Sequence, residues 1–158
     1  MIQDMNPEDI TGDYQETTLT LYGNLTRKIY YTELETPYPD GKLIVSTTDP
    51  DGIITHANKA FIEMSGYSEQ ELIGTEHSIL RHPDMPAAAF KDLWDTVLKG
   101  EKWQGIVKNL RKDGGYYWVK ATVIPNVRNG RVVSYTSVRR KPSRSKVEEC
   151  INIYPTLF

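Results

Sequence analysis

The last third of the chain constrains the fold more than any other part, because it has the pattern of three consecutive strands joined by tight turns. Apolar and polar residues alternate over 103–112, 116–127 and 131–140, as in half-buried β-strands. The breaks hold DGG at 113–115 and NG at 129–130, which favour hairpin turns because glycine adopts positive φ without strain. The sequence therefore predicts an antiparallel meander.

A second pair of strands is predicted upstream of the meander. Residues 43–48 are rich in β-branched side chains, residues 49–52 (DPDG) favour a turn, and residues 53–55 continue as a return strand. The two groups together give five antiparallel strands.

Helices are predicted between these two groups of strands. Ser68 and Glu71 have the spacing of a capping box. A longer helix is expected to begin after Asp84 with Pro86 in its first turn, and its apolar face comprises Phe90, Leu93, Trp94, Val97 and Leu98. The fold class is therefore α+β, a five-stranded antiparallel sheet with short helices on one face. The hollow between sheet and helices is the default ligand site.

The two ends of the chain differ from this central domain, which we expect to span residues 42–142. Residues 1–41 form a polar, acidic arm with one strand-like patch at 28–31, and we expect the arm to dock loosely. Residues 143–158 contain a second capping-box pattern at 145–148 (SKVE). We expect a C-terminal helix there that leaves the domain as an output or dimerisation element.

Charge is unevenly distributed along a chain whose net charge is −2. Residues 1–40 carry eight acidic and two basic side chains, whereas residues 99–146 carry thirteen basic and two acidic ones. A basic block of this size is compatible with nucleic acid or an acidic partner. Its bases alternate with apolar residues, however, so we interpret them as solvent-facing strand positions balanced by the arm, and we expect no nucleic-acid binding.

Composition excludes several classes of protein. No apolar run approaches the ~20 residues of a membrane span, and the acidic start lacks the profile of a secretion signal. The single cysteine, Cys150, forms no internal disulfide, which fits a reducing compartment, and three scattered histidines make no zinc site. We therefore expect a cytoplasmic protein.

A charged loop, HSILRHPDMP at 77–86, precedes the longer helix. Arg81, His82 and Asp84 place a cation fork, a switchable donor and a carboxylate in one short loop that two prolines stiffen. The same residues are also typical of an Arg–Asp network that caps a helix. The loop by itself leaves both interpretations open.

The wider set of motifs resembles the PAS domain of bacterial aerotaxis receptors over about residues 42–142. It comprises LIVSTTD (43–49), ITHAN (54–58), RHPDMP (81–86), WQGIVKN (103–109) and YWV (117–119). The resemblance implies a PAS fold that binds FAD non-covalently, reports redox state or oxygen, and is not an enzyme. It also implies signalling to a domain or protein partner, and we expect a homodimer.

The family's flavin-binding positions map onto nine residues of this chain: Asn58, His77, Arg81, His82, Asp84, Trp94, Trp103, Asn109 and Tyr117. One departure is Ser78, where the family commonly has an asparagine after the histidine.

The chemistry of these positions is consistent with a flavin. The Asn109 amide offers a donor and an acceptor to the polar ring edge, and Gly105 on the same strand face leaves room for a flat ring. Arg81 suits a pyrophosphate, and His77, if protonated, would favour the reduced form. An exposed strand position for Asn109 and a plain core role for Trp94 are the alternatives. Lys108 is expected to be solvated.

Other functions remain open from the residues alone. A PAS interaction module without flavin would have an empty pocket, another small ligand, or haem held by His77 or His82. An acid–base enzyme would use Arg81, His82 and Asp84, but neither a cysteine nor a set of metal ligands accompanies them in sequence. A cysteine–flavin adduct is not expected, because Cys150 lies beyond the last strand.

Overall fold

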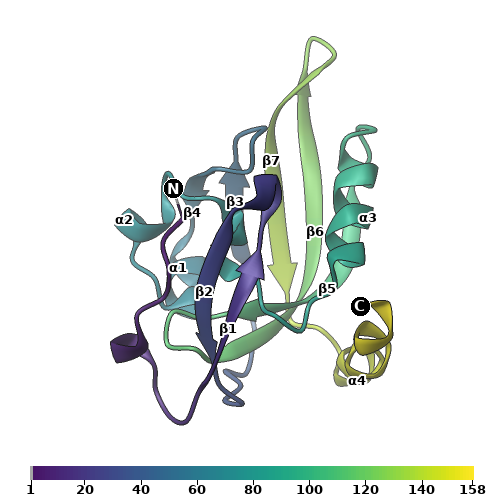
Figure 1. Ribbon diagram of the computed structural model, residues 1–158. Helices are drawn as coiled ribbons and strands as arrows, with labels where there is room; N and C mark the ends of the chain where they lie inside the picture. The colour runs from purple at the N-terminus through teal and green to yellow at the C-terminus, as the bar shows by residue number, and fades with distance from the viewer. Residues whose placement is uncertain (1) are drawn as a thin grey trace.

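A single antiparallel sheet of five strands is the centre of the computed structural model, which describes residues 2–158 (Figure 1). Its strand order is β4-β3-β7-β6-β5. The strands are β3 (Ile44–Thr48), β4 (Ile54–Ala57), β5 (Trp103–Leu110), β6 (Tyr116–Arg128) and β7 (Arg131–Arg140). All five predicted strands and the α+β class are confirmed.

The helices between β4 and β5 cover one face of this sheet (Figure 1). They are α1 (Lys59–Ser65), α2 (Glu69–Leu72), the 3-10 turn η3 (His77–Leu80) and α3 (Ala87–Val97). Both hydrogen bonds of the predicted capping box at Ser68 and Glu71 are present, at 3.1 and 3.0 Å. Pro86 is the N-cap of α3 and not part of its first turn, so the helix begins at Ala87, later than expected.

The N-terminal segment packs more closely on the domain than the loosely docked arm that we predicted. It forms a hairpin of β1 (Gln15–Thr20) and β2 (Thr26–Tyr31), with the 3-10 turn η2 (Tyr22–Asn24) between them and η1 (Pro7–Asp9) before. Ile29 of β2 is fully buried in a second small core with Met5 and Leu110. The strand-like patch at 28–31 is thus confirmed, whereas its partner strand was missed. The arm's boundary at residue 41 stays a prediction.

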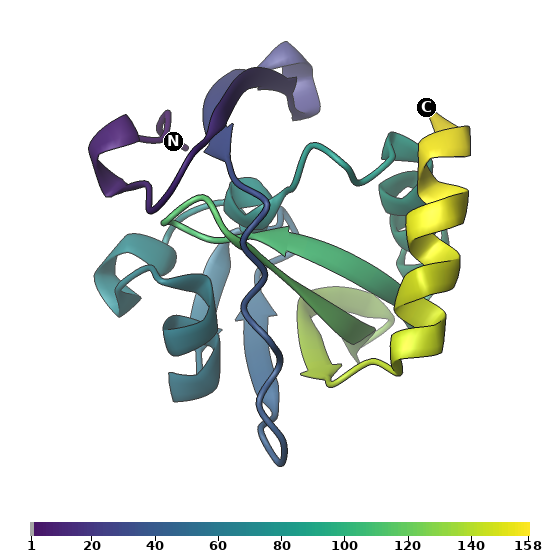
Figure 2. The ribbon, with the colours of Figure 1, turned by 90° about the horizontal axis from the view of Figure 1, so that it is seen from below.

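The C-terminal helix folds back onto the domain, so the prediction that it leaves the domain is wrong for this structure. Helix α4 (Arg144–Ile153) is followed by η4 (Tyr154–Leu157), and it lies beside β5 (Figure 2). Val147 is 2% exposed, and the Tyr154 ring lies 6.4 Å from that of Trp118. Burial of these apolar groups against the sheet holds the helix there. Its N-cap is Ser143, not Ser145.

Two ion pairs join the acidic arm to the basic block, as the charge distribution suggested. Lys141 Nζ lies 2.6 Å from Asp40 Oδ1, and Arg144 Nη1 lies 3.3 Å from Glu35 Oε1.

None of the helices in residues 2–158 is both long and apolar enough to cross a membrane. Within the same residues, no group of His, Cys, Asp and Glu is arranged to hold a metal ion.

Candidate ligand-binding site

A cavity of about 140 Å³ lies between the inner face of the sheet and the segments η3 and α3. Strands β5, β6 and β7 line it, because every second residue of a strand points to the same face. Val107 and Asn109 line it from β5, and Tyr135, Ser137 and Arg139 line it from β7. The predicted ligand cavity is therefore present.

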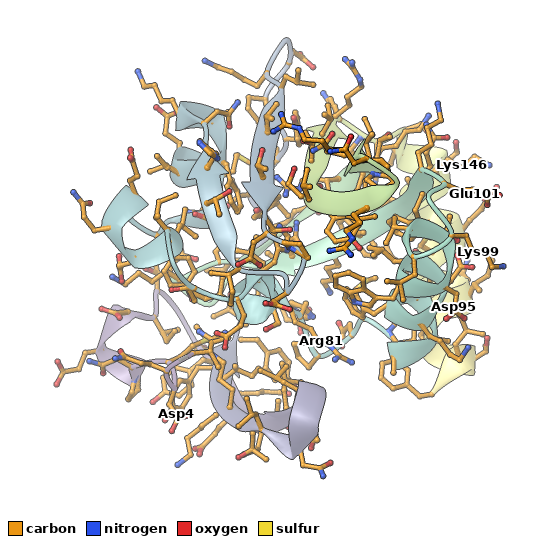
Figure 3. The ribbon with its side chains drawn as sticks, turned by 90° about the horizontal axis from the view of Figure 1, so that it is seen from above. Asp4, Arg81, Asp95, Lys99, Glu101 and Lys146 are labelled. Atoms are coloured by element: carbon orange, nitrogen blue, oxygen red, sulfur yellow. The ribbon has the colours of Figure 1, made fainter. Side chains whose placement is uncertain are left out.

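An open groove of about 800 Å³ adjoins this cavity on its outer side. Leu21 and Leu25 of the N-terminal segment form one side of the groove, and Lys91 of α3 lies on the other. Arg81 lines both the cavity and the groove, and Figure 3 shows it between α3 and the N-terminal segment. Its guanidinium carbon lies 4.8 Å from the centre of the Phe90 ring.

Arg139 and His77 form a buried pair at the inner side of the cavity. Arg139 Nη2 donates to His77 Nε2 at 2.9 Å and to Ser46 Oγ at 2.5 Å. Because a guanidinium only donates, His77 Nε2 is an acceptor and the ring is neutral. Burial and the Arg139 charge lower the pKa of His77 to about 3. His77 is thus not the protonated donor that the sequence suggested.

Sequence reasoning did not select Arg139 as a site residue. The signal was available, because Arg139 shares its strand face with Tyr135 and Ser137 and is a charged residue at an inward position. What the sequence alone did not show is the distance to His77, which lies 62 positions earlier.

The Trp103 indole occupies the space beside Gly105 that we expected a ligand ring to use. A Cβ atom added to Gly105 would lie 2.3 Å from Trp103 Cη2. The indole nitrogen donates to Asp92 Oδ2 of α3 at 2.8 Å. The flat ring that packs on Gly105 in this structure is therefore the indole of Trp103, from the same strand, and not a ligand ring.

Asn109 and Trp94 occupy the cavity wall. Asn109 is 5% exposed, so the alternative of an exposed strand position is wrong. Trp94 packs edge-on against Tyr135, with ring centres 5.6 Å apart, and lines both the cavity and the outer groove. Together with His77, Arg81 and Trp103, they are the predicted residues that the fold brings together around one space.

Asn58 lies away from the cavity and joins α1 to β3. Its Oδ1 atom accepts from the backbone N–H of Phe61 at 3.0 Å and from that of Val45 at 3.1 Å. Its Nδ2 atom donates to the carbonyl of Leu43 at 2.8 Å. These bonds use the amide as a helix N-cap, so its role here is in supporting the sheet.

His82 and Asp84 lie on the other side of the β5 edge from the cavity. The loop pairs with this edge at Arg81, which forms an antiparallel bridge with Asn109. The His82 ring, 1% exposed, meets Tyr31 and Tyr116 edge-on. Burial and the nearby Lys108 charge lower the pKa of His82 to about 3, against the opposing effect of Asp84.

Asp84 holds the loop to β5 through Lys108. Lys108 Nζ lies 2.8 Å from Asp84 Oδ2 and 4.2 Å from the centre of the Tyr116 ring. Burial opposes ionisation of Asp84, but the Lys108 hydrogen bond and charge hold the pKa of its carboxyl below the usual value. The prediction of a solvated Lys108 is wrong, since its side chain is only 12% exposed.

Tyr117 stands opposite Asn109 in the β5–β6 ladder and is fully buried. Burial raises the pKa of its hydroxyl to about 12, so it is protonated at neutral pH. It lies outside the set of residues that line the cavity.

Comparison with known proteins identifies the family. A family model described as PAS fold matches residues 54–139. The chain belongs to the PAS family. Its sequence is 47% identical over 128 residues to the aerotaxis receptor of Escherichia coli K12, an alignment that covers 81% of this chain and 25% of the receptor. The resemblance stated from the sequence motifs is thereby confirmed.

Two further proteins are similar to this chain. The nitrogen fixation regulatory protein of Klebsiella pneumoniae is 29% identical over 141 residues, covering 86% of this chain and 28% of that protein. The light-state structure of the blue-light photoreceptor Aureochrome1 LOV superposes with a TM-score of 0.62 at 26% identity, covering 69% of this chain and 88% of that one. The chain spans about a quarter of the length of these two curated relatives, the aerotaxis receptor and the nitrogen fixation regulatory protein.

The cavity of this PAS domain has chemically distinct parts. Val107, Val119 and Ala121 give one apolar wall, while Asn109 and Arg139 present hydrogen-bond donors. An aromatic ligand with one polar edge is the class of molecule that such a surface recognises.

Proposed function

We propose that this PAS domain is a sensory module that binds FAD, reports redox state or oxygen, and signals through protein–protein contacts. The observation that carries the proposal is the division of the cavity into an apolar wall and a polar end at Asn109, Arg139 and His77. A flavin has a benzenoid end that suits the former and a donor–acceptor edge that suits the latter. The resemblance to aerotaxis receptors independently implies FAD.

The residues that line the cavity fit the chemistry of a flavin, but the cavity is too small for the ring unless one side chain moves. Pockets for ligands of this size are usually about 300–1,000 Å³, whereas the cavity measures about 140 Å³. We infer that the ring enters as the Trp103 indole moves off Gly105 and gives up its bond to Asp92. The adjoining groove, which Arg81 also lines, would then receive the pyrophosphate at this guanidinium.

Bound FAD would supply reversible uptake of electrons, and the chain would convert the resulting charge into a change in contacts. The Asn109 amide would bind the polar ring edge as donor and acceptor. Asn109 lies on β5, where it also forms the backbone bridge to Arg81. Three residues earlier on the same strand, the Ile106 carbonyl accepts a hydrogen bond from the Tyr154 hydroxyl of the C-terminal segment. Coupling of about 1–3 kcal/mol between the cavity and this segment is enough for a graded signal.

The proposed partner is a signalling domain or protein, in the same chain or a separate one, and the proposed compartment is the cytoplasm. A homodimer also stays a prediction, which analytical ultracentrifugation of the purified chain would test. A sedimentation coefficient that stays at the monomer value at all concentrations would exclude it.

The decisive experiment is an absorbance spectrum of gently purified protein, followed by mass identification of the molecule that a denaturant releases. We expect a flavin spectrum and the mass of FAD. Asn109→Ala should weaken flavin retention, whereas Gln104→Ala, an exposed position on the same strand, should not. A colourless chain that takes up no added FAD refutes the proposal.

A PAS interaction module without flavin is the second candidate. The observation that favours it is the small cavity, whose wall includes a Trp103 indole packed onto Gly105. It predicts that added FAD leaves both the absorbance and the tryptophan emission unchanged. Haem is the less favoured ligand, because His77 Nε2 already accepts from Arg139 and His82 lies outside the cavity.

A further inference from the structure

The outer groove shares Arg81 with the cavity, and the N-terminal segment forms one of its sides (Figure 3). Leu21 and Leu25, which flank the turn η2, line that side. Leu21 is only 7% exposed and packs within the main core, so the segment is a fixed wall of the groove. A ligand that extends past Arg81 from the cavity would therefore lie against these two leucines.

Glu76 presents an unpaired carboxyl oxygen at the same groove. The residue lines the groove, and its Oε2 atom is buried with no hydrogen-bond partner among residues 2–158. Glu76 is the N-cap residue of η3, yet its side chain makes no capping hydrogen bond. A buried acceptor that has no donor is costly, and such groups are rare in folded proteins. A ligand in the groove could supply the donor that this oxygen lacks.

Backbone contacts fix the position of Glu76 between the groove and the cavity. Glu76 and Ile53 form an antiparallel bridge. The backbone N–H of the next residue, His77, donates to the Gly52 carbonyl at 3.0 Å, and His77 lines both the cavity and the groove. The carboxyl group is therefore held beside the polar end of the cavity, where the outer half of an extended ligand would pass.

The chemistry of the groove indicates which donor would bind there. The other acidic group that α3 adds to the groove, Asp95, is already paired, since its Oδ2 atom lies 2.6 Å from Lys91 Nζ. In dinucleotide-binding folds a carboxylate binds the hydroxyl groups of a ribose. With the pyrophosphate of FAD at Arg81, the ribose of its adenosine half is the next group along the molecule. Adenine beyond it would meet the apolar side chains of Leu21 and Leu25.

We propose that Glu76 accepts hydrogen bonds from the ribose hydroxyls of the adenosine half of FAD, in a groove that the N-terminal segment completes, and so makes this chain select FAD over FMN. The inference rests on the proposed function. FMN ends at its phosphate and has no adenosine, so it would leave the Glu76 oxygen unpaired and the two leucines uncovered. A site built to pair a hydroxyl group discriminates against a ligand that lacks it.

The test compares the affinities of FAD and FMN by equilibrium titration of the chain after any bound flavin has been removed. We expect the wild-type chain to bind FAD at least tenfold more tightly than FMN. Glu76→Ala should lose about tenfold in its affinity for FAD and keep its affinity for FMN. Glu76→Gln, which retains one acceptor oxygen, should keep most of the FAD affinity. Glu101→Ala is the control, because Glu101 is exposed and outside the groove.

A second variant tests the wall that the N-terminal segment contributes. Leu25 is 43% exposed, so Leu25→Ser removes apolar surface from the groove with little disturbance of the core. It should lower the affinity for FAD several-fold and leave that for FMN unchanged. Equal effects on the two flavins would show that this wall does not contact the adenosine half.

A third measurement needs no flavin. Glu76→Ala removes a buried oxygen without a partner, so the empty chain should unfold at a urea concentration equal to or above that of the wild type. A residue whose role is to hold the fold together would show the opposite change. A midpoint well below that of Glu101→Ala would therefore overturn the assignment of Glu76 to ligand recognition.

The outcomes distinguish this inference from the function on which it rests. A wild-type chain that binds no flavin at all refutes both. A chain that binds FAD and FMN equally, or a Glu76→Ala variant without a selective loss of FAD affinity, refutes only the role of Glu76.

Discussion

Arg27 is the residue whose loss should most clearly show how the N-terminal segment is held to the PAS domain. It is 3% exposed, and its guanidinium donates to the Gln3 carbonyl at 2.7 Å, the Ile79 carbonyl at 2.9 Å and the Tyr67 hydroxyl at 3.2 Å. Arg27→Met keeps an unbranched apolar side chain in the same space but removes every donor. It therefore tests the hydrogen bonds with little loss of packing.

The expected loss of stability follows from the hydrogen-bond acceptors that Arg27→Met would leave without a donor. The Ile79 carbonyl and the Tyr67 hydroxyl are bonded within buried contacts, and each buried group left unsatisfied costs about 1–3 kcal/mol. Allowing for partial relaxation, the free energy of unfolding should fall by about 2–4 kcal/mol. With a urea dependence of about 2 kcal/mol per molar, the unfolding midpoint should fall by about 1–2 M.

Urea unfolding followed by circular dichroism measures this loss, and Lys28→Met is the matched control. Lys28 is the next residue of β2, and its only described ion pair, with Glu16, is exposed, so its removal should change the midpoint little. Amide exchange in β1 and β2 should also accelerate in Arg27→Met if the hairpin detaches locally. Equal midpoints for the two variants, with unchanged exchange, would show that Arg27 does not anchor the segment.

Three further outcomes follow from the structure. Gly105→Ala should either displace the Trp103 indole, visible as a shift in tryptophan emission, or cost about 1–3 kcal/mol of stability; no change in either contradicts the observed 2.3 Å approach. The two buried histidines, His77 and His82, each have a pKa lowered from 6.5 to about 3, so below pH 6.5 the unfolded chain binds protons that the folded chain does not. Stability should therefore be full above pH 6.5 and fall by about 1.4 kcal/mol per pH unit for each histidine as the pH decreases towards 3. His82→Gln should reduce the pH dependence of the free energy of unfolding by about 1.4 kcal/mol per pH unit. An unaltered pH dependence would show that His82 does not have the lowered pKa. Ser143→Ala should weaken the start of α4 by about 1 kcal/mol, measured by amide exchange, whereas Ser145→Ala should have little effect.

The sequence determined those features that depend on neighbours a few positions apart. Alternation over two residues and the turn sequences specified the strands of the sheet, and the Ser68–Glu71 spacing specified a helix start. The inward face of β5 followed from the same alternation, which is why Asn109 was correctly expected in the cavity. Such signals are local because backbone geometry repeats over two to four residues.

The tertiary structure decided which of the candidate side chains meet. Arg81 and His82 are adjacent in sequence, yet only Arg81 lines the cavity. The loop pairs with β5 at Arg81, and consecutive side chains of such an extended segment point to opposite sides. Arg139 meets His77 across 62 positions, and α4 turns back because Val147 and Tyr154 find apolar surface on the sheet. Contacts between distant segments depend on how the whole chain assembles around the sheet, and no pattern of neighbouring residues encodes that assembly.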